Sequence, residues 1–294
     1  MAEQDWTGKS KGKKTGYQIF VFLLRFSGLR VAYSLLVFVA FYYLLTSRNS
    51  NRAIYQYFRQ IGFGKLKSSY SVYLNYFVFG QCLLDKIAAM AGIKTNFKFD
   101  FEGEVNLHKM VNQGKGGILL SAHVGNWEIA GHYLDRIDAA VSIVMYDAEY
   151  QAIKEYLDRV TGKRKTRVIP IKEDMSHLFE IKTALENKEL VCIHADRLLP
   201  GSKRSLQIPF MGKNAEFPYS IFRMIIMLQA PVSFVFSFKE SANSYHFSAT
   251  EIMQFDGDRD DELKKLSGSF VAELENRLRQ FPLQWFNYYD FWKA

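Results

Sequence analysis

The sequence of 294 residues predicts an α/β fold, a central mixed sheet flanked by helices, with a membrane-anchor helix at the N-terminus. Two observations carry this prediction. Short apolar runs of strand length alternate with segments of helical spacing over the last two thirds of the chain. A long apolar segment precedes them and follows a polar stretch with four lysines. We therefore expect a basic N-terminus and anchor (1–46), a helical aromatic-rich segment (47–95) and one α/β domain (96–294).

The N-terminal apolar segment runs from Tyr17 to Leu45, with Arg25 and Arg30 as its charged residues. Its uninterrupted part, Val31–Leu45, is fifteen residues long, short of the roughly 20 that a spanning helix needs. No small-residue cleavage site follows it, so we expect no cleaved signal peptide. We expect an anchor that spans the bilayer or lies in its interface, with the basic flank in the cytoplasm. The alternative is a pair of apolar helices packed on the domain.

The composition favours a lipid surface as the partner. The formal net charge is +8 and aromatic residues make up 16% of the chain, which suits anionic headgroups or nucleic acid. No DNA- or RNA-binding motif accompanies the charge, so we expect a membrane and no nucleic acid. Cys82 and Cys192 lie in apolar runs without disulfide or metal spacing, which indicates a reducing compartment.

The domain is organised around a turn from strand to helix in residues 116–131. Gly117–Ser121 is a short apolar run behind a glycine-rich turn, the pattern of a buried strand. His123 follows the strand, Gly125 permits a sharp bend, and Asn126 stands where a helix N-cap would. We expect a site here, because open α/β sheets bind ligands at the carboxyl ends of their strands.

His123 and Glu128 can meet only across this bend. On one continuous helix, residues five apart point roughly 140° away from each other. With the bend, Glu128 in the first helical turn can hold one nitrogen of the imidazole, which makes His123 a general base with a fixed tautomer. Such a base suits a hydroxyl or amine that attacks a carbonyl, and the backbone N–H groups near Gly125 and Asn126 are candidates to hold the oxyanion. The alternative is a buried structural histidine in a capped turn.

The pattern H-V-G-N-W-E, after a buried strand and behind an apolar N-terminus, resembles the bacterial lipid A biosynthesis acyltransferases of the lauroyl/myristoyl type. These belong to the wider lysophospholipid acyltransferase superfamily, and the resemblance extends over about residues 16–240. It implies a glycerol-3-phosphate acyltransferase-like fold and transfer from an acyl thioester of acyl carrier protein or coenzyme A to a lipid acceptor. It also implies a role in lipopolysaccharide synthesis at the inner (cytoplasmic) membrane, with the catalytic domain on the cytoplasmic side.

Later blocks carry the resemblance further. The strand Leu190–Ala195 is followed by Asp196, which matches the family's A-D or P-D pair, and then by P-G and P-F-M-G blocks. Asp196 is expected to orient the acceptor or a basic neighbour; the alternative is a carboxylate in a strand-end turn. A functional arginine of the family falls on Arg164, within one residue either way, where the alternative is a solvated basic run. Arg197 and Arg204 are candidates to contact phosphate on the donor or acceptor.

One position departs from the family. Lipid A acyltransferases often carry an arginine in a V-Y-R setting after the second strand of the site, whereas this chain has Asp147 in V-M-Y-D. A carboxylate there disfavours a strongly anionic headgroup. We therefore expect a less phosphorylated acceptor than the usual lipid A precursor: a monophosphorylated lipid, a glycolipid or an aminolipid.

Other functions fit the sequence less well. A hydrolase would need a G-x-S-x-G elbow or a cysteine beside a histidine, and the sequence has neither. A zinc enzyme would need clustered ligands, whereas the six histidines are scattered, so we expect no metal and no redox cofactor. The non-enzyme alternative is a lipid-binding protein, which is disfavoured because both members of the dyad and the Asp196 block are intact.

The remaining pattern predicts the other elements of the chain. Two helices broken near Gly62 and Gly64 are expected in residues 50–91, and the acidic turn at 256–260 is expected to cap a helix and not to bind calcium. The further strands are expected at 97–102, 141–145, 168–171, 232–238 and 245–250, and the further helices at 106–112, 150–160, 175–186, 221–228 and 262–279.

Overall fold

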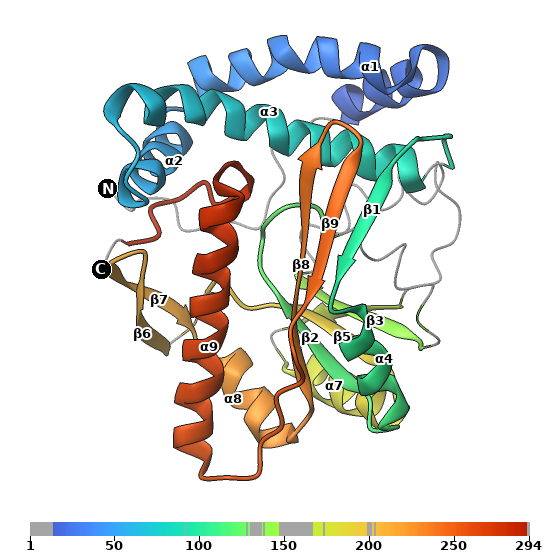
Figure 1. Cartoon of the computed structure of the whole chain (residues 1–294), viewed down its shortest axis with the longest axis vertical. Helices are drawn as coiled ribbons and strands as arrows, with labels where there is room; N and C mark the ends of the chain where they lie inside the picture. The colour runs from blue at the N-terminus through green and yellow to red at the C-terminus, as the bar shows by residue number, and fades with distance from the viewer. Residues whose placement is uncertain are drawn as a thin grey trace.

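The computed structural model describes residues 14–90, 92–127, 129, 137, 139–146, 167–172, 174–198, 202 and 204–292. Within this part of the chain, seven strands form one mixed sheet in the order β1-β9-β8-β2-β5-β3-β4 (Figure 1). β8 and β9 pair antiparallel, and the other neighbouring strands pair parallel. The predicted α/β class is therefore confirmed. The strands are β1 (Lys98–Glu102), β2 (Gly117–Ser121), β3 (Val141–Tyr146), β4 (Arg167–Ile171), β5 (Leu190–His194), β8 (Val232–Ser241) and β9 (Ser244–Ala249).

The strands were predictable because they follow the hydrophobic pattern closely. Every residue of β2 is buried, as its continuous apolar run predicts. A two-stranded hairpin, β6 (Ser205–Phe210) with β7 (Lys213–Pro218), was not predicted as a pair. Its two turn residues, Met211 and Gly212, have φ values of 53° and 84°, which is the backbone that a two-residue hairpin turn requires.

The helices of the domain also follow their predicted positions. They are α4 (Glu104–Asn112), α7 (Ser176–Glu186), α8 (Tyr219–Leu228) and α9 (Arg259–Gln280). The side chain of Asp258 accepts hydrogen bonds from the backbone N–H groups of Asp260 and Asp261, so the acidic turn caps α9 as predicted. The helix predicted at 150–160 lies outside the described residues.

Three helices precede the domain: α1 (Lys14–Thr46), α2 (Arg48–Gln60) and α3 (Lys65–Met90). Figure 1 shows α1 lying along α3 at one end of the molecule, with the tip of the β8–β9 hairpin against α3. Gly28, with φ 76°, breaks α1, and the part that follows the break lies in a 23-residue segment long and apolar enough to cross a membrane. Gly80 on α3 lets α3 and α1 approach closely, because a Cβ at this position would lie 2.3 Å from the side chain of Leu36 on α1. The predicted N-terminal apolar helix is therefore present.

α1 has two faces of different character. Its buried residues, Leu24, Ala32, Leu36 and Ala40, form the face toward the rest of the protein. Its other face exposes large apolar side chains, namely Phe22, Phe26, Val31, Val37, Phe38, Phe41, Tyr42 and Leu45. An exposed apolar surface of this size is typical of a contact with a membrane or another protein.

The C-terminal tail packs back on the domain, as its aromatic composition predicts. Trp285 is almost fully buried and its ring meets Tyr57 at 4.8 Å between centroids. From α3, the side-chain amide of Asn75 donates hydrogen bonds to the carbonyl oxygens of Leu283 and Trp285, at 2.9 and 3.0 Å. The tail is thus fixed between the N-terminal helices and the sheet.

Candidate active site

The parallel pairing of β2 with β5 brings two predicted site residues together. Ser121, the last residue of β2, pairs with His194, the last residue of β5. The chain then continues from both strands at the same edge of the sheet, and His123 meets Asp196 there. The imidazole Nδ1 of His123 lies 2.7 Å from Oδ1 of Asp196, and the backbone N–H of His123 donates to Oδ2 at 3.0 Å.

The surroundings of this pair fix its protonation. The Asp196 side chain is fully buried, while that of His123 is 24% exposed. Burial alone would raise the pKa of Asp196, but the adjacent His123 and the positive charge of Arg197 hold that pKa well below its usual range. Asp196 is therefore a carboxylate at pH 7. It keeps the His123 proton on Nδ1, which leaves Nε2 as the basic nitrogen.

Gly125 makes the bend that the sequence predicts. Its φ is 55°, and a Cβ at this position would lie 1.8 Å from the carbonyl oxygen of Ser237. Asn126 follows as a cap, because its Oδ1 accepts a hydrogen bond from the N–H of Ile129 at 3.4 Å. The turn therefore requires glycine at position 125 both for its conformation and for its close packing on β8.

The backbone N–H groups of these two residues, which were candidates to hold the oxyanion, already have acceptors within the protein. The N–H of Gly125 donates to the carbonyl oxygen of Gln284 at 2.9 Å, and the N–H of Asn126 donates to that of Ser237 at 2.8 Å. Both groups are therefore already engaged and cannot be preorganised donors for a substrate oxygen. The side chain of Asn126 is buried as well, with its amide donating to the carbonyl oxygen of Cys82 and the hydroxyl of Tyr245. Gly125 and Asn126 thus hold the turn through these hydrogen bonds.

The C-terminal tail completes the turn from the other side. The N–H of Phe286 donates to the carbonyl oxygen of His123 at 3.1 Å, and Val124 forms an isolated antiparallel bridge with Trp285. Arg197 donates through Nη2 to the carbonyl oxygen of Phe286 at 2.8 Å. This nitrogen of Arg197 is therefore bonded to the tail, and the phosphate contact of Arg197 stays a prediction.

The remaining predicted site residues are distributed differently. Arg204 is exposed before β6, with its guanidinium 5.8 Å from the ring centroid of Tyr219, and no contact joins it to His123 or Asp196 among the described residues. Glu128 and Arg164 lie outside the described residues, as does Asp147. Their predicted roles therefore stay predictions.

His194 is a site residue that the sequence analysis missed. Its ring centroid lies 4.5 Å from that of His123 and 4.9 Å from that of Trp127. Burial, reinforced by the neighbouring His123, holds the pKa of His194 well below its usual range, so this imidazole is neutral at pH 7. The sequence could have indicated His194, because both histidines stand at the ends of predicted buried strands.

Within the described part of the chain, no group of three or more His, Cys, Asp and Glu side chains is placed to hold a metal ion.

These observations define the class of protein. A histidine held by a buried carboxylate, at the carboxyl edge of parallel strands, has the geometry of a general base for an attacking hydroxyl or amine. The chain belongs to the bacterial lipid A biosynthesis acyltransferase family, whose sequence model matches residues 74–294. It is therefore an acyltransferase that acts on lipids, as the sequence predicts.

Two further comparisons were made with known proteins. No curated protein matches the chain. Among solved structures, the chain is similar to the crystal structure of the 1-acyl-sn-glycerophosphate (LPA) acyltransferase PlsC from Thermotoga maritima, with 14% sequence identity and a TM-score of 0.40. That alignment covers 88% of this chain and 100% of the other.

Proposed function

We propose that this acyltransferase moves a fatty acyl chain from an acyl thioester to a hydroxyl or amine of a membrane lipid, with a lipid A precursor as the leading acceptor. The family supports the lipid A assignment. The proposed donor is carried by acyl carrier protein or coenzyme A, and no metal or redox cofactor takes part. The alternative acceptors are a glycolipid or an aminolipid.

In the proposed reaction, Nε2 of His123 takes the proton from the acceptor hydroxyl as its oxygen attacks the thioester carbonyl. A carbon–oxygen bond forms, the carbon–sulfur bond then breaks, and the proton passes from the imidazolium to the departing thiolate. Asp196 stabilises the transient imidazolium, since its carboxylate lies 2.7 Å from Nδ1. A positioned base of this kind typically contributes about 10²–10⁴-fold to the rate.

The contact between His123 and Asp196 is the observation that carries this proposal. His123→Ala should abolish transfer of a labelled acyl chain from thioester to lipid while leaving the circular dichroism spectrum unchanged. His108→Ala is a matched control, because His108 lies on α4 with its side chain half exposed. Near-normal turnover by a folded His123→Ala protein would overturn the proposed mechanism.

The family and the apolar face of α1 support attachment to a membrane, which we propose to be the inner membrane with the domain on its cytoplasmic side. α3 packs against α1 and carries exposed lysines, Lys65 and Lys67, which are costly in hydrocarbon. Their presence beside α1 favours a helix that lies in the interface over one that crosses the bilayer. Removal of residues 1–46 should release the protein from sedimented membranes, and retention of the truncated protein would contradict this.

Asp147 supports a narrower proposal for the acceptor, because a carboxylate repels a phosphorylated headgroup more strongly as water is excluded. Wild type should prefer a monophosphorylated lipid A precursor to a bisphosphorylated one, and Asp147→Arg should reduce that preference. Transfer rates with both lipids would be compared for the two proteins. Faster transfer by wild type to the bisphosphorylated lipid, without a gain from Asp147→Arg, would show that Asp147 lies away from the headgroup.

A further inference from the structure

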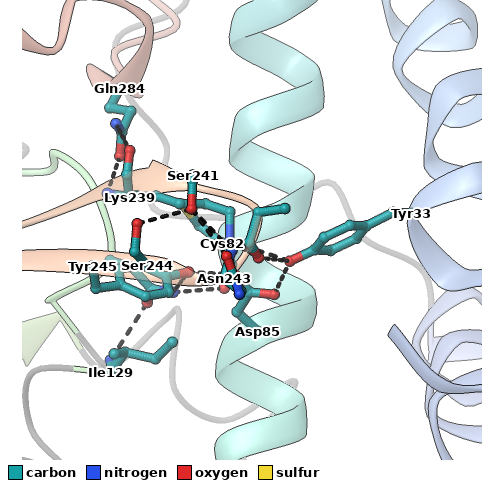
Figure 2. Close-up of polar contacts among 12 residues, drawn as sticks. Tyr33, Cys82, Asp85, Ile129, Lys239, Ser241, Asn243, Ser244, Tyr245 and Gln284 are labelled. Atoms are coloured by element: carbon teal, nitrogen blue, oxygen red, sulfur yellow. Dashed lines mark hydrogen bonds and ion pairs between the residues drawn. The ribbon is translucent and has the colours of Figure 1, made fainter. Parts of the chain in front are cut away.

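A buried polar network lies between α1, α3 and the β8–β9 hairpin (Figure 2). Its centre is an ion pair between Asp85 and Lys239, whose side chains are 0% and 3% exposed. The hydroxyls of Tyr33 and Tyr245 both donate to the Asp85 carboxylate. A buried ion pair contributes little net stability, because desolvation of the charges offsets their attraction. We therefore looked for a positional role of the network, namely the segments that its hydrogen bonds hold in place.

One chain of hydrogen bonds connects this network, through Tyr245, to the turn of residues 123–126, which we call the catalytic turn. The Tyr245 hydroxyl donates to Asp85 and accepts a hydrogen bond from the side-chain amide of Asn126 at 3.2 Å. The same amide donates to the carbonyl oxygen of Cys82 on α3 at 2.9 Å. The Asn126 side chain is thus held from β9 and from α3 at once. Asn126 lies in the turn that begins at His123.

A second route leads to the same turn through the backbone of Lys239. Its N–H donates to Oε1 of Gln284 at 2.8 Å, and its carbonyl oxygen accepts from Nε2 of Gln284 at 2.7 Å. The backbone carbonyl of Gln284 in turn accepts from the N–H of Gly125 at 2.9 Å. Both routes therefore start at the ion pair and end on adjacent residues, Gly125 and Asn126.

The other end of the network is on α1. Tyr33 lies within the candidate membrane segment Leu24–Thr46, and its hydroxyl is bonded to Asp85 and to Nζ of Lys239, the latter at 3.2 Å. Figure 2 shows Tyr33 reaching toward Asp85 from the helix opposite α3. Three hydrogen bonds therefore connect Tyr33 on α1 to the side-chain amide of Asn126: Tyr33 to Asp85, Asp85 to Tyr245, and Tyr245 to Asn126.

We propose that Asp85, Lys239 and Tyr245 are positioning residues for acyl transfer, which fix His123 through Asn126 and Gln284, and that Tyr33 makes this positioning depend on the docking of α1. This inference rests on the proposed role of His123 as the base. The reaction is sensitive to such positioning, since a misplacement of about 1 Å at the reacting groups can lower a rate by about 10²-fold.

The test uses two conservative variants in the full-length protein, Tyr245→Phe and Tyr33→Phe. Each removes one hydroxyl and keeps both charges of the ion pair, whereas loss of Asp85 or Lys239 would leave a buried charge without its partner and endanger the fold. Tyr73→Phe is the matched control. The Tyr73 hydroxyl also joins α3 to α1, through the carbonyl oxygen of Val37 at 3.4 Å, but has no contact with the network among the described residues.

We expect Tyr245→Phe to lower kcat by roughly tenfold, with the KM for the thioester within about twofold of wild type. Tyr33→Phe should lower kcat in the same direction by less, and Tyr73→Phe should match wild type. Because a structural role alone would reduce the folded fraction, the ¹⁵N signals of the His123 imidazole are recorded as well, assigned by their loss in His123→Ala. They should shift in Tyr245→Phe and Tyr33→Phe and stay in place in Tyr73→Phe.

Wild-type kcat and unshifted His123 signals in a folded Tyr245→Phe protein would overturn the positioning role. Equal losses in Tyr33→Phe and Tyr73→Phe would overturn the dependence on α1, because they would reflect general loosening of the two helices. The His123→Ala arm separates the two proposals. If His123→Ala is inactive while Tyr245→Phe is normal, the positioning inference alone fails, whereas normal turnover by His123→Ala overturns the proposed function.

Discussion

Two buried carboxylates in this molecule each face a basic side chain, and the two pairs differ in what the basic partner can reach. Asp196 is fully buried, yet its partner His123 keeps 24% of its side chain exposed. Asp85 is equally buried, and Lys239 keeps 3%. The imidazole can therefore meet a substrate, whereas the ammonium is enclosed. We call His123–Asp196 the proposed reactive pair and Asp85–Lys239 the proposed supporting pair. The acid is buried in both, and the exposure of the basic partner distinguishes them.

The largest expected effect tests the reactive pair. Asp196→Asn keeps the shape of the side chain, but its amide can impose the other tautomer on His123. We expect kcat for acyl transfer to fall by about 10³-fold. The exposed Asp256→Asn variant should be unaffected. A loss of less than about tenfold would mean that Asp196 does not set the state of the imidazole.

Glu128 tests whether the reactive pair has a second acidic member. We expect Glu128→Gln to lose most of its transfer activity, about 10²-fold, with a smaller change in binding to lipid vesicles, because the residue is predicted to act on the imidazole. Transfer and vesicle binding would be measured on the same preparation, with the exposed Glu251→Gln as control. Wild-type turnover would leave Asp196 as the carboxylate that acts on His123.

Substitution of the supporting pair, Asp85 and Lys239, should change the free energy of unfolding. Asp85→Asn leaves Lys239 charged in a buried site, and we expect the free energy of unfolding to fall by about 3 kcal/mol. Asp85→Leu combined with Lys239→Met should recover most of that stability without recovering kcat, since the bonds to Tyr245 and Tyr33 stay lost. Chemical unfolding in detergent and the transfer assay check the two halves of this prediction. Recovery of both quantities would contradict a positioning role.

The smallest expected effect is on acid stability. The folded-state pKa of Asp196 is lowered, because the opposing effect of burial is outweighed by His123 and Arg197. Its contribution to stability is therefore fully present above the unfolded-state pKa of about 4 and is lost as the pH falls toward the folded-state pKa. Between about pH 4 and 2, the thermal midpoint of Asp196→Asn should fall less steeply than that of wild type. Parallel slopes for the two proteins would contradict the lowered pKa.

The sequence predicts the local parts of the site well. The strand before His123, the bend at Gly125 and the cap at Asn126 depend on neighbouring residues, so their pattern is readable from a short stretch. The contact of His123 with Asp196 depends instead on the pairing of β2 with β5. Local sequence patterns do not specify which strands pair. The sequence therefore placed Asp196 in the site but left its partner open between the acceptor and a basic neighbour, and it assigned the imidazole of His123 to Glu128.

The supporting pair could not be predicted from the sequence. Asp85 and Lys239 are 154 residues apart, and each stands beside a residue of opposite charge, Lys86 and Glu240, a pattern typical of exposed side chains. The acceptors of the candidate oxyanion donors could not be predicted for a related reason. The N–H groups of Gly125 and Asn126 are taken by Gln284 and Ser237, which lie far along the chain and give no local signal.

The hydrogen bonds between the catalytic turn and residues 284–286 also bear on how the protein is made. A ribosome completes the turn at residues 123–126 long before it reaches Gln284 and Phe286, whose backbones bond to Gly125 and His123. During synthesis, therefore, α1 is complete while the turn still lacks two of its partners. A nascent chain that stops before residue 284 has the sheet and the histidine but not the held turn. Translation order thus makes these two hydrogen bonds to the turn among the last contacts that the chain can form.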